Sequence, residues 1–353
     1  MNERQFIVLK RNEGHTFKEI ADTLNIMNNK KCKLDLIIDP SKEAYELSKK
    51  FNTEYFSKIV IALVKCRADG VIIATPNSVH KKNAELFIKK KIPILIEKPL
   101  SSDVKSALDI VIYARKQNTP VLTGHHRRHN KIIQKAKSKI KSGDLGKIIA
   151  CHATCWLFKP NNYFNSWRKS IGGGPLLINL VHDIDLMRYL IGEIECVLSF
   201  ESNSFRGGDT EDTAVVLLKF DNGSLGTLSV SDTIISPWSW ELTSKENSVY
   251  PNQKQNCYWI GGTHGSMELP QSKIWKSTEK RGWWEPLTQT NNKVDETKNH
   301  PLNEQLDNFL AVIEKKQEPV CSGLDGLNTL AVIEAIKLAA KRGATVKPEI
   351  LTD

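Results

Sequence analysis

Two polar side chains interrupt an otherwise apolar, helix-forming stretch, and they are the first candidates for chemistry. Residues 172–192 read GGGPLLINLVHDIDLMRYLIG, in which Asn179 and His182 lie three apart and therefore on one face of a helix. A helix that is apolar almost all round is buried, and buried polar side chains need partners. His182 is therefore either a satisfied core histidine or a general acid or base that faces a pocket between domains.

A second set of polar residues follows short apolar runs that are typical of strands. The set consists of Asp39, Thr75, Pro76, Asn77, Glu97 and Lys98. An acidic residue that closes the second strand of a dinucleotide-binding sheet accepts hydrogen bonds from ribose hydroxyls and repels a 2′-phosphate, and Asp39 has that place. Alternatively, Asp39 only begins an Asp-Pro-Ser turn. His80 either meets a ligand at the turn that contains Asn77 or is an exposed helix residue.

The stretch ILIEKPLS, residues 94–101, ends an apolar strand in a carboxylate, an ammonium and a proline. Proline disfavours the helical region for the residue before it, so Lys98 is expected to be extended and held more tightly than most surface lysines. The alternative is that Glu97 and Lys98 are merely the first solvated residues after the strand. The neighbouring strand ends decide between the two readings.

The elements that position these residues follow from the apolar periodicity of the first third of the chain. Short β-rich runs alternate with helical stretches, which predicts a parallel sheet with crossover helices. Strands are expected at 6–9, 32–40, 70–76, 92–99 and 120–126, with helices at 41–51, 78–91 and 104–117. Ligands bind outside the carboxyl ends of the strands in such sheets, so the polar strand ends should line one crevice.

The pattern changes beyond about residue 123. Helices are expected at 131–142, 172–192 and 326–343, and a strand at 146–158. Residues 213–232 contain two apolar runs around Asn-Gly, which is a strong hairpin signal. The expected fold class is therefore α/β: a doubly wound parallel sheet over 1–122, followed by an α+β domain with a mixed or antiparallel sheet over 123–353.

Bulk composition argues against several classes of protein. The chain has 353 residues, which is enough for two domains, and no apolar run approaches the roughly 20 residues that span a bilayer. The net charge of +10 suggests nucleic-acid binding, but the densest basic run, 125–141, also has Ile132, Ile133 and Ala136 at helical spacing. Its lysines then form a solvated helix face. Seven cysteines without framework spacing favour a reducing cytoplasm, and no metal site is expected.

Seven stretches occur in an order and spacing that resemble the Gfo/Idh/MocA family of NAD(P)-dependent sugar and polyol dehydrogenases. They are LIIDPS, DGVIIATPNSVH, LIEKPLS, VLTGHHRRHN, SGDLGKIIACHATCW, GGGPLLINLVHDIDLMRYLIGE and GLDGLNTLAVIEA, within residues 32–345. The resemblance implies an N-terminal Rossmann domain and a second domain built on a large open sheet, with the last helix packing back near the first domain. It also implies homodimers or homotetramers packed through that sheet.

The resemblance further implies roles for particular residues. Lys98 and His182 would contact the substrate carbon that exchanges hydride with the nicotinamide; Lys98 donates to the hydroxyl oxygen, His182 is the general base and Asn179 orients either group. The cofactor, NAD rather than NADP, would contact Gly14, Asp39, Thr75, Pro76, Asn77, His80, Glu97 and Lys98. The sugar or polyol substrate would contact Arg128, Trp156, Lys159, Tyr163, Trp167 and Arg168.

Two departures from the family pattern bear on function. A family member has a G-x-G-x-x-G turn after its first strand, whereas LKRNEGHTFKEIADTL offers only Gly14, and in either register side chains stand where glycines belong. Many members also have an aspartate four residues before the histidine, where this chain has Ile178. The same N-terminal stretch is similar to the first helices of a bacterial helix-turn-helix, but a strand follows where the recognition helix belongs.

These observations give a leading hypothesis and an alternative. The first is a cytoplasmic oxidoreductase that moves a hydride between NAD(H) and a secondary hydroxyl of a sugar, inositol or related polyol. The alternative, motivated by the missing glycines, is a relative that binds or senses a sugar with weak or no dinucleotide binding. No nucleic-acid or membrane partner is expected, and salt-sensitive binding to duplex DNA would test that expectation.

Overall fold

The computed structural model describes residues 4–10, 31–65, 68–164, 168, 172–278, 280–291 and 300–350. Outside the described residues lie Gly14, Cys66, Trp167 and the stretch 11–30, on which the glycine-turn and helix-turn-helix predictions rest. The chain divides into two compact units, which are described separately. The first is Met1–His129 with His300–Leu330 and Ile350–Asp353, and the second is Asn130–Asn299 with Ala331–Glu349. The predicted division after residue 122 stays a prediction.

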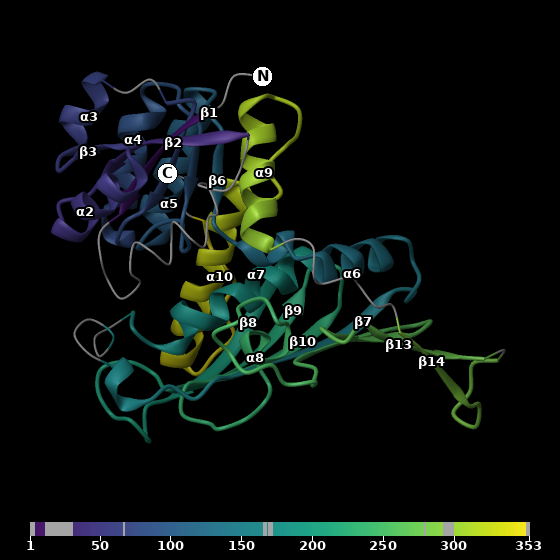
Figure 1. The fold of residues 1–353 in the computed structure, drawn as a ribbon. Helices are drawn as coiled ribbons and strands as arrows, with labels where there is room; N and C mark the ends of the chain where they lie inside the picture. The colour runs from purple at the N-terminus through teal and green to yellow at the C-terminus, as the bar shows by residue number, and fades with distance from the viewer. Residues whose placement is uncertain are drawn as a thin grey trace. The chain divides into compact units, whose positions relative to one another are not determined.

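Six strands form the sheet of the first unit (Figure 1), in the order β3-β2-β1-β4-β5-β6. Their bounds are β1 Arg4–Lys10, β2 Cys32–Ile38, β3 Glu54–Phe56, β4 Gly70–Ala74, β5 Ile94–Ile96 and β6 Val121–Thr123. Every pairing between neighbours is parallel, so the predicted doubly wound parallel sheet is confirmed. The periodicity does not indicate β3, which is only three residues long.

Helices connect these strands, as the alternation of apolar runs predicts. They are α2 Lys42–Phe51, α3 Ile59–Lys65, α4 His80–Ile88 and α5 Val104–Lys116. Ser41 and Asp103 cap the N-termini of α2 and α5 by accepting hydrogen bonds from first-turn N–H groups. Helix α9, Pro301–Ile313, also belongs to this unit, and its Phe309 shares a core with Ile72 and Leu95 of the sheet. The sequence analysis identified neither α3 nor α9.

Eight strands form the sheet of the second unit, in the order β14-β13-β12-β11-β7-β10-β9-β8. Their bounds are β7 Ile148–Trp156, β8 Ile194–Ser202, β9 Thr213–Phe220, β10 Leu225–Ser231, β11 Tyr258–Gly262, β12 Ser266–Leu269, β13 Lys273–Ser277 and β14 Leu287–Asn291. Only β7 and β10 pair in parallel, so the sheet is mixed, as expected. Strands β9 and β10 form the hairpin that Asn-Gly predicts.

Helices cover one face of this second sheet (Figure 1). They are α6 Lys131–Lys141, α7 Val181–Leu190 and the part of α10 (Gly323–Arg342) that follows Leu330; a short α8, Trp240–Thr243, also belongs to the unit. Ile133, Ile184 and Ile336 from these helices lie in one core with inward-facing strand residues such as Val216 and Leu228. The lysines of α6 are therefore on the side of that helix that faces away from its buried isoleucines.

The other face of the sheet exposes apolar side chains. Phe200 is 64% exposed, Leu225 57%, Leu217 53% and Val215 47%, and these residues alternate along their strands with buried ones. An exposed apolar face of this kind indicates an interaction surface. In the described ranges, no helix has the length and apolar character needed to cross a lipid bilayer.

A buried ion pair joins the end of the first sheet to the start of α10 within the first unit. Arg128 is 4% exposed, and its Nη1 donates to Asp325 Oδ1 at 3.0 Å and to the Val320 carbonyl at 3.2 Å. Asp325 also accepts from the N–H and hydroxyl of Ser322. Burial raises the pKa of Asp325, but Arg128 and Ser322 outweigh that effect and hold the pKa below its ordinary value.

Asp325→Asn should lower the free energy of unfolding by about 2 kcal/mol near neutral pH, because the buried guanidinium of Arg128 loses its counter-charge. The folded pKa of Asp325 lies below 3.8, so the carboxylate stabilises fully above that pH and its contribution is lost as the pH falls through the folded pKa. The free energies of unfolding of variant and wild type, measured in urea, should therefore converge as the pH falls below 3.8 and through the folded pKa of Asp325.

The control for this experiment is Asp307→Asn, which breaks the exposed pair of Asp307 with Lys31. That substitution should change the free energy of unfolding by less than about 1 kcal/mol. Equal losses in the two variants at neutral pH would contradict the prediction for Asp325.

Candidate active site

One row of paired residues crosses the sheet of the first unit where its strands end. Ile38 pairs with Leu9, Leu9 with Ile73, Ile73 with Ile96, and Ile96 with Thr123. Because these strands run in the same direction, the segments that follow the row leave the sheet at one edge. That edge carries Asp39, Thr75, Pro76, Asn77, Glu97, Lys98 and Gly124.

Hydrogen bonds from Ser41 and Tyr55 hold Asp39 at this edge. It is 2% exposed, its Oδ1 accepts from the Ser41 N–H at 2.7 Å, and its carbonyl oxygen accepts from the Tyr55 hydroxyl at 2.6 Å. The turn that formed the alternative reading of Asp39 is therefore present. The turn and a ribose contact do not exclude one another, and the ribose contact stays a prediction.

His80 ties two of the strand ends together. It is 1% exposed, so the reading of an exposed helix residue is wrong. Nε2 lies 2.7 Å from the Thr75 carbonyl oxygen, and Nδ1 lies 3.1 Å from that of Pro99 and 3.2 Å from that of Leu100. Burial lowers the pKa of His80, and the three carbonyl oxygens offset part of that effect. The imidazole thus bridges the segments after β4 and β5, and the cofactor contact stays a prediction.

The segment that contains Lys98 is anchored on both sides. The Glu97 N–H donates to the Ile73 carbonyl at 2.8 Å, and the Lys98 N–H donates to Glu97 Oε2 at 3.3 Å. A Cβ on Gly124 would lie 3.0 Å from Glu97 Oε2, so glycine leaves room for this carboxylate. The Lys98–Pro99 peptide bond is cis. Arg128, predicted to contact the substrate, is engaged by Asp325 in the same unit.

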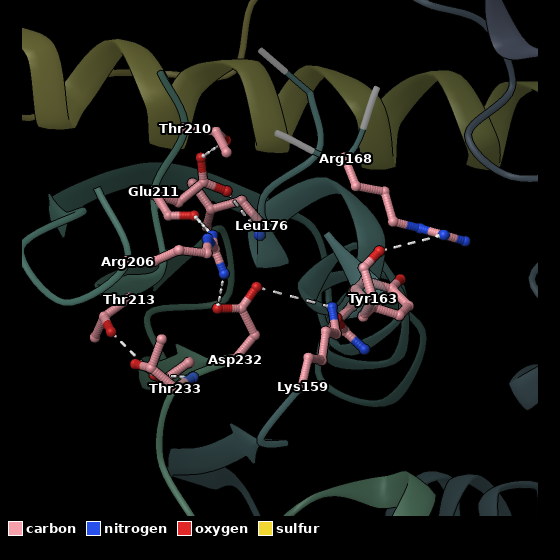
Figure 2. Close-up of polar contacts among 12 residues, drawn as sticks. Lys159, Tyr163, Arg168, Leu176, Arg206, Thr210, Glu211, Thr213, Asp232 and Thr233 are labelled. Carbon is pink, nitrogen blue, oxygen red and sulfur yellow. Dashed lines mark hydrogen bonds and ion pairs between the residues drawn. The ribbon is translucent and has the colours of Figure 1, made fainter. Parts of the chain in front are cut away.

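The second unit contains a cluster of buried charges (Figure 2), which we call the Asp232 cluster: Lys159, Tyr163, Arg168, Arg206, Glu211 and Asp232. Lys159 follows β7, and its N–H donates to the Asp232 carbonyl at 2.9 Å. Its Nζ lies 4.0 Å from Asp232 Oδ2 and donates to Asn179 Oδ1 at 2.6 Å. Burial lowers the pKa of Lys159, while Asp232 opposes that shift.

Asp232 lies between two cations (Figure 2). It is 1% exposed; Arg206 donates to Oδ1, while Oδ2 is the oxygen that faces Lys159. Burial raises the pKa of Asp232, and Lys159 and Arg206 oppose that effect. Sequence reasoning missed both Asp232 and Arg206. Asp232 does follow a strand of the predicted hairpin, whereas Arg206 is in a polar loop that gives no signal.

Three consecutive glycines, 172–174, allow other parts of the chain to pack closely against the start of the following helix. A Cβ on Gly174 would lie 2.2 Å from Glu211 Oε1, and a Cβ on Gly173 would lie 2.4 Å from the Arg168 carbonyl oxygen. Glu211 Oε1 accepts from the Leu176 N–H at 3.0 Å, which satisfies a donor at the start of the helix. The glycines therefore permit a close approach, with Glu211 and Arg168 as the approaching groups.

Asn179 and His182 are both buried, at 8% and 7% exposure. The predicted helix begins as a π-helical turn, Leu176–Leu180, and continues as α7, so Asn179 and His182 belong to different helical segments. Asn179 accepts from Lys159 and donates through Nδ2 to Glu241 Oε1 at 3.3 Å. Its amide therefore links an ammonium to a carboxylate, and the catalytic roles of Asn179 and His182 stay predictions.

Three of the predicted substrate residues come together around one ring. Lys159 Nζ lies 4.9 Å and the Arg168 guanidinium carbon 4.2 Å from the centroid of Tyr163. Trp156 instead donates through Nε1 to Ser229 Oγ at 2.8 Å. Among the described residues, no group of His, Cys, Asp and Glu side chains has the geometry of a metal site.

Asp232→Asn should lower the free energy of unfolding by about 3 kcal/mol, because Lys159 and Arg206 stay buried while their shared counter-charge is removed. The pKa of Lys159, measured by NMR of its side chain, should fall further, since Asp232 raises it. Asp221→Asn, an exposed position in the β9–β10 turn, is the control. Coincident denaturation curves for the two variants would show that the Asp232 ion pairs do not stabilise the unit.

Comparison with known proteins identifies both parts of the chain. Residues 14–125 match the family model described as the NAD-binding Rossmann fold of an oxidoreductase family, and residues 137–347 match the C-terminal alpha/beta domain of that family. The WlbA dehydrogenase from Bordetella pertussis, solved in complex with NADH and UDP-GlcNAcA, shares the fold at 22% identity. Its TM-score is 0.78, and the match covers 99% of this chain and 100% of that one.

Curated relatives include proteins that act on sugars and inositol. The 2,7-anhydro-N-acetylneuraminate hydratase of Escherichia coli is 26% identical over 72% of this chain and 65% of its own length, just under two thirds of that relative. The 1,5-anhydro-D-fructose reductase of Ensifer adhaerens is 25% identical over 80% of each chain. The myo-inositol 2-dehydrogenase of Thermotoga maritima is 28% identical over 46% of this chain and 49% of its own. With both domain models matched in order, the chain belongs to the Gfo/Idh/MocA oxidoreductase family.

Proposed function

We propose that this chain is an oxidoreductase that moves a hydride between NAD(H) and a secondary hydroxyl carbon of a sugar, inositol or related polyol. The observation that carries the proposal is the row of strand ends, which places Asp39, Thr75 and Lys98 at one edge of a parallel sheet. The names of the reductase and the inositol dehydrogenase among the relatives support this substrate class.

NAD is the proposed cofactor, and NADP is disfavoured. When bound, NAD supplies the hydride acceptor; Asp39 would hold its ribose, and Thr75, Pro76, Asn77, Glu97 and Lys98 would line its site. A buried carboxylate at the end of the second strand accepts from two ribose hydroxyls and repels a phosphate on one of them. The described edge fits a dinucleotide in this respect, while the segment for the pyrophosphate lies outside the described residues.

Two side chains are proposed to act on the substrate hydroxyl. Lys98 would donate a hydrogen bond to the oxygen on which charge develops, and His182 would accept the proton as general base. Asn179 is bound at both ends by Lys159 and Glu241, which suits a group that orients others. Tyr163 and the two cations over its ring, Lys159 and Arg168, are proposed to contact the substrate.

We also propose that the chain forms homodimers or homotetramers through the exposed face of the eight-stranded sheet. Among the residues of β7, β9 and β10 that face away from the helices, Lys219 is the only charged one, and it is paired with Glu195 at 2.7 Å. A flat, nearly uncharged face is self-complementary to a second copy around a two-fold axis. The described cysteines are free, which suits a cytoplasmic location, and we expect neither nucleic acid nor membrane as a partner.

Wild-type protein should bind NADH with micromolar affinity and more tightly than NADPH, as measured by calorimetry. Asp39→Asn keeps an oxygen for the Ser41 N–H but removes the charge, so the preference for NADH should fall by about tenfold. Binding of neither dinucleotide, together with binding of a sugar, would reject the proposal in favour of the sensing alternative.

Lys98→Ala should lower kcat by about 100-fold with a substrate found in a panel of sugars and inositols, because the transition state loses its donor. Lys105→Ala, an exposed lysine of α5, is the matched control and should keep wild-type turnover. Both NADH production and substrate mass should be followed, since one relative is named a hydratase. Unchanged turnover in Lys98→Ala would refute the role of Lys98.

A further inference from the structure

A second polar site lies in the second unit, built from residues that the Asp232 cluster does not include. A cavity of about 550 Å³, widely open to solvent, is lined by the C-terminal turn of α6, the β11–β12 turn, β13 and the loop that follows β13. The lining residues that matter for its chemistry are Lys139, Asp144, His264, Lys276, Ser277 and Arg281. The proposed oxidoreductase function uses none of them.

Positive charge exceeds negative charge in this cavity. The lining contains three cations, Lys139, Lys276 and Arg281, and one carboxylate, Asp144. Lys139 Nζ lies 3.1 Å from Asp144 Oδ2, and Lys276 donates to Oδ1. Lys276 and Lys139 hold the pKa of Asp144 below its ordinary value, so the carboxylate stays ionised and cancels one charge of three. With a neutral histidine, the lining carries a net charge of +2.

Arg281 is held in place at the cavity. Its Nη1 donates to the Thr263 carbonyl at 3.2 Å, and its Nη2 donates to His264 Nε2 at 2.6 Å. A guanidinium only donates, so His264 accepts and is neutral, with its proton on Nδ1 beside Thr263 Oγ1. These two contacts use two of the five N–H groups of an arginine, and the others can serve a ligand.

The wall that contains His264 is closely packed. Gly146 has φ +70°, and a Cβ there would lie 1.9 Å from His264 Nδ1 and 2.2 Å from Thr263 Oγ1. The His264 N–H donates to the Leu145 carbonyl at 2.9 Å, and the Thr263 N–H to the Lys147 carbonyl at 2.9 Å. The turn after α6 therefore fits closely against the β11–β12 turn, which holds the two groups, His264 and the Thr263 carbonyl, that accept from Arg281.

We propose that this cavity binds a tetrahedral oxyanion of the phosphate class, either inorganic phosphate or the phosphoryl group of a small metabolite. A phosphate dianion matches the net charge of the lining. The planar guanidinium of Arg281 can donate to two oxygens at once, the lysines act as point charges, and the Ser277 hydroxyl adds a neutral donor.

The test is calorimetric titration of the whole chain with inorganic phosphate and, separately, with glucose 6-phosphate, both against chloride at constant ionic strength. Saturable binding is expected, and Arg281→Gln should weaken it by about tenfold or more because a charge-assisted donor is lost. Lys280→Gln removes the same charge one residue away, outside the cavity lining, and should leave the affinity within about twofold. Tighter binding of one ligand identifies the source of the phosphoryl group.

Absence of saturable binding would overturn the proposal, and so would equal weakening by the two substitutions, which would indicate general electrostatic attraction. The affinity for NADH should be the same in Arg281→Gln and wild type. The experiment therefore separates failure of this site from failure of the proposed dehydrogenase, because each has its own binding readout.

Discussion

Parallel pairing of the strands in the first unit is the constraint on which its chemistry depends. The paired row from Ile38 to Thr123 fixes where each strand ends, and so the residues that follow must leave the sheet together. The ends of β4 and β5 are then joined by the imidazole of His80 and by the hydrogen bond from the Glu97 N–H to the Ile73 carbonyl. Asp39 is held at the edge because its N–H donates to the Phe56 carbonyl of β3, and Lys98 is held because its N–H donates to the Glu97 carboxylate.

The second unit depends on a different constraint, because it buries several charges close together. Burial raises the pKa of a carboxylate unless nearby cations compensate. Buried cations, in turn, remain charged more readily when an ionised carboxylate lies beside them. Asp232 serves Lys159 and Arg206 together, and the glycine run allows Glu211 to reach the start of the neighbouring helix. The cluster therefore depends most on Asp232, because its removal takes the shared counter-charge from both cations.

Periodicity in the sequence is informative where an element's apolar pattern is local. It predicts β2, β4, β7 and most helices of the first unit closely, and it predicts the β9–β10 hairpin from its turn residues. It gives no individual prediction for β11 to β14 or for α9, whose burial depends on strands far away in the sequence. The same limit applies to the site, because α7 and strands β8 to β10 separate Lys159 from Asp232 in the sequence, and the two residues meet only in the folded unit. His80 was singled out, yet its three carbonyl partners could not be read from its neighbours in sequence.

The residue at position 178 shows how the structure accommodates a departure from the family pattern. Ile178 replaces the aspartate that many relatives have, so the buried helix loses a negative charge near His182. The next residue, Asn179, joins the Lys159 ammonium to the Glu241 carboxylate through the two ends of its amide. Glu241 thus supplies a carboxylate to the same polar chain from a different segment, α8, and Asn179 transmits its orientation without carrying a charge. A neutral amide in this place can hold both charged groups at once, because its oxygen accepts from Lys159 and its nitrogen donates to Glu241.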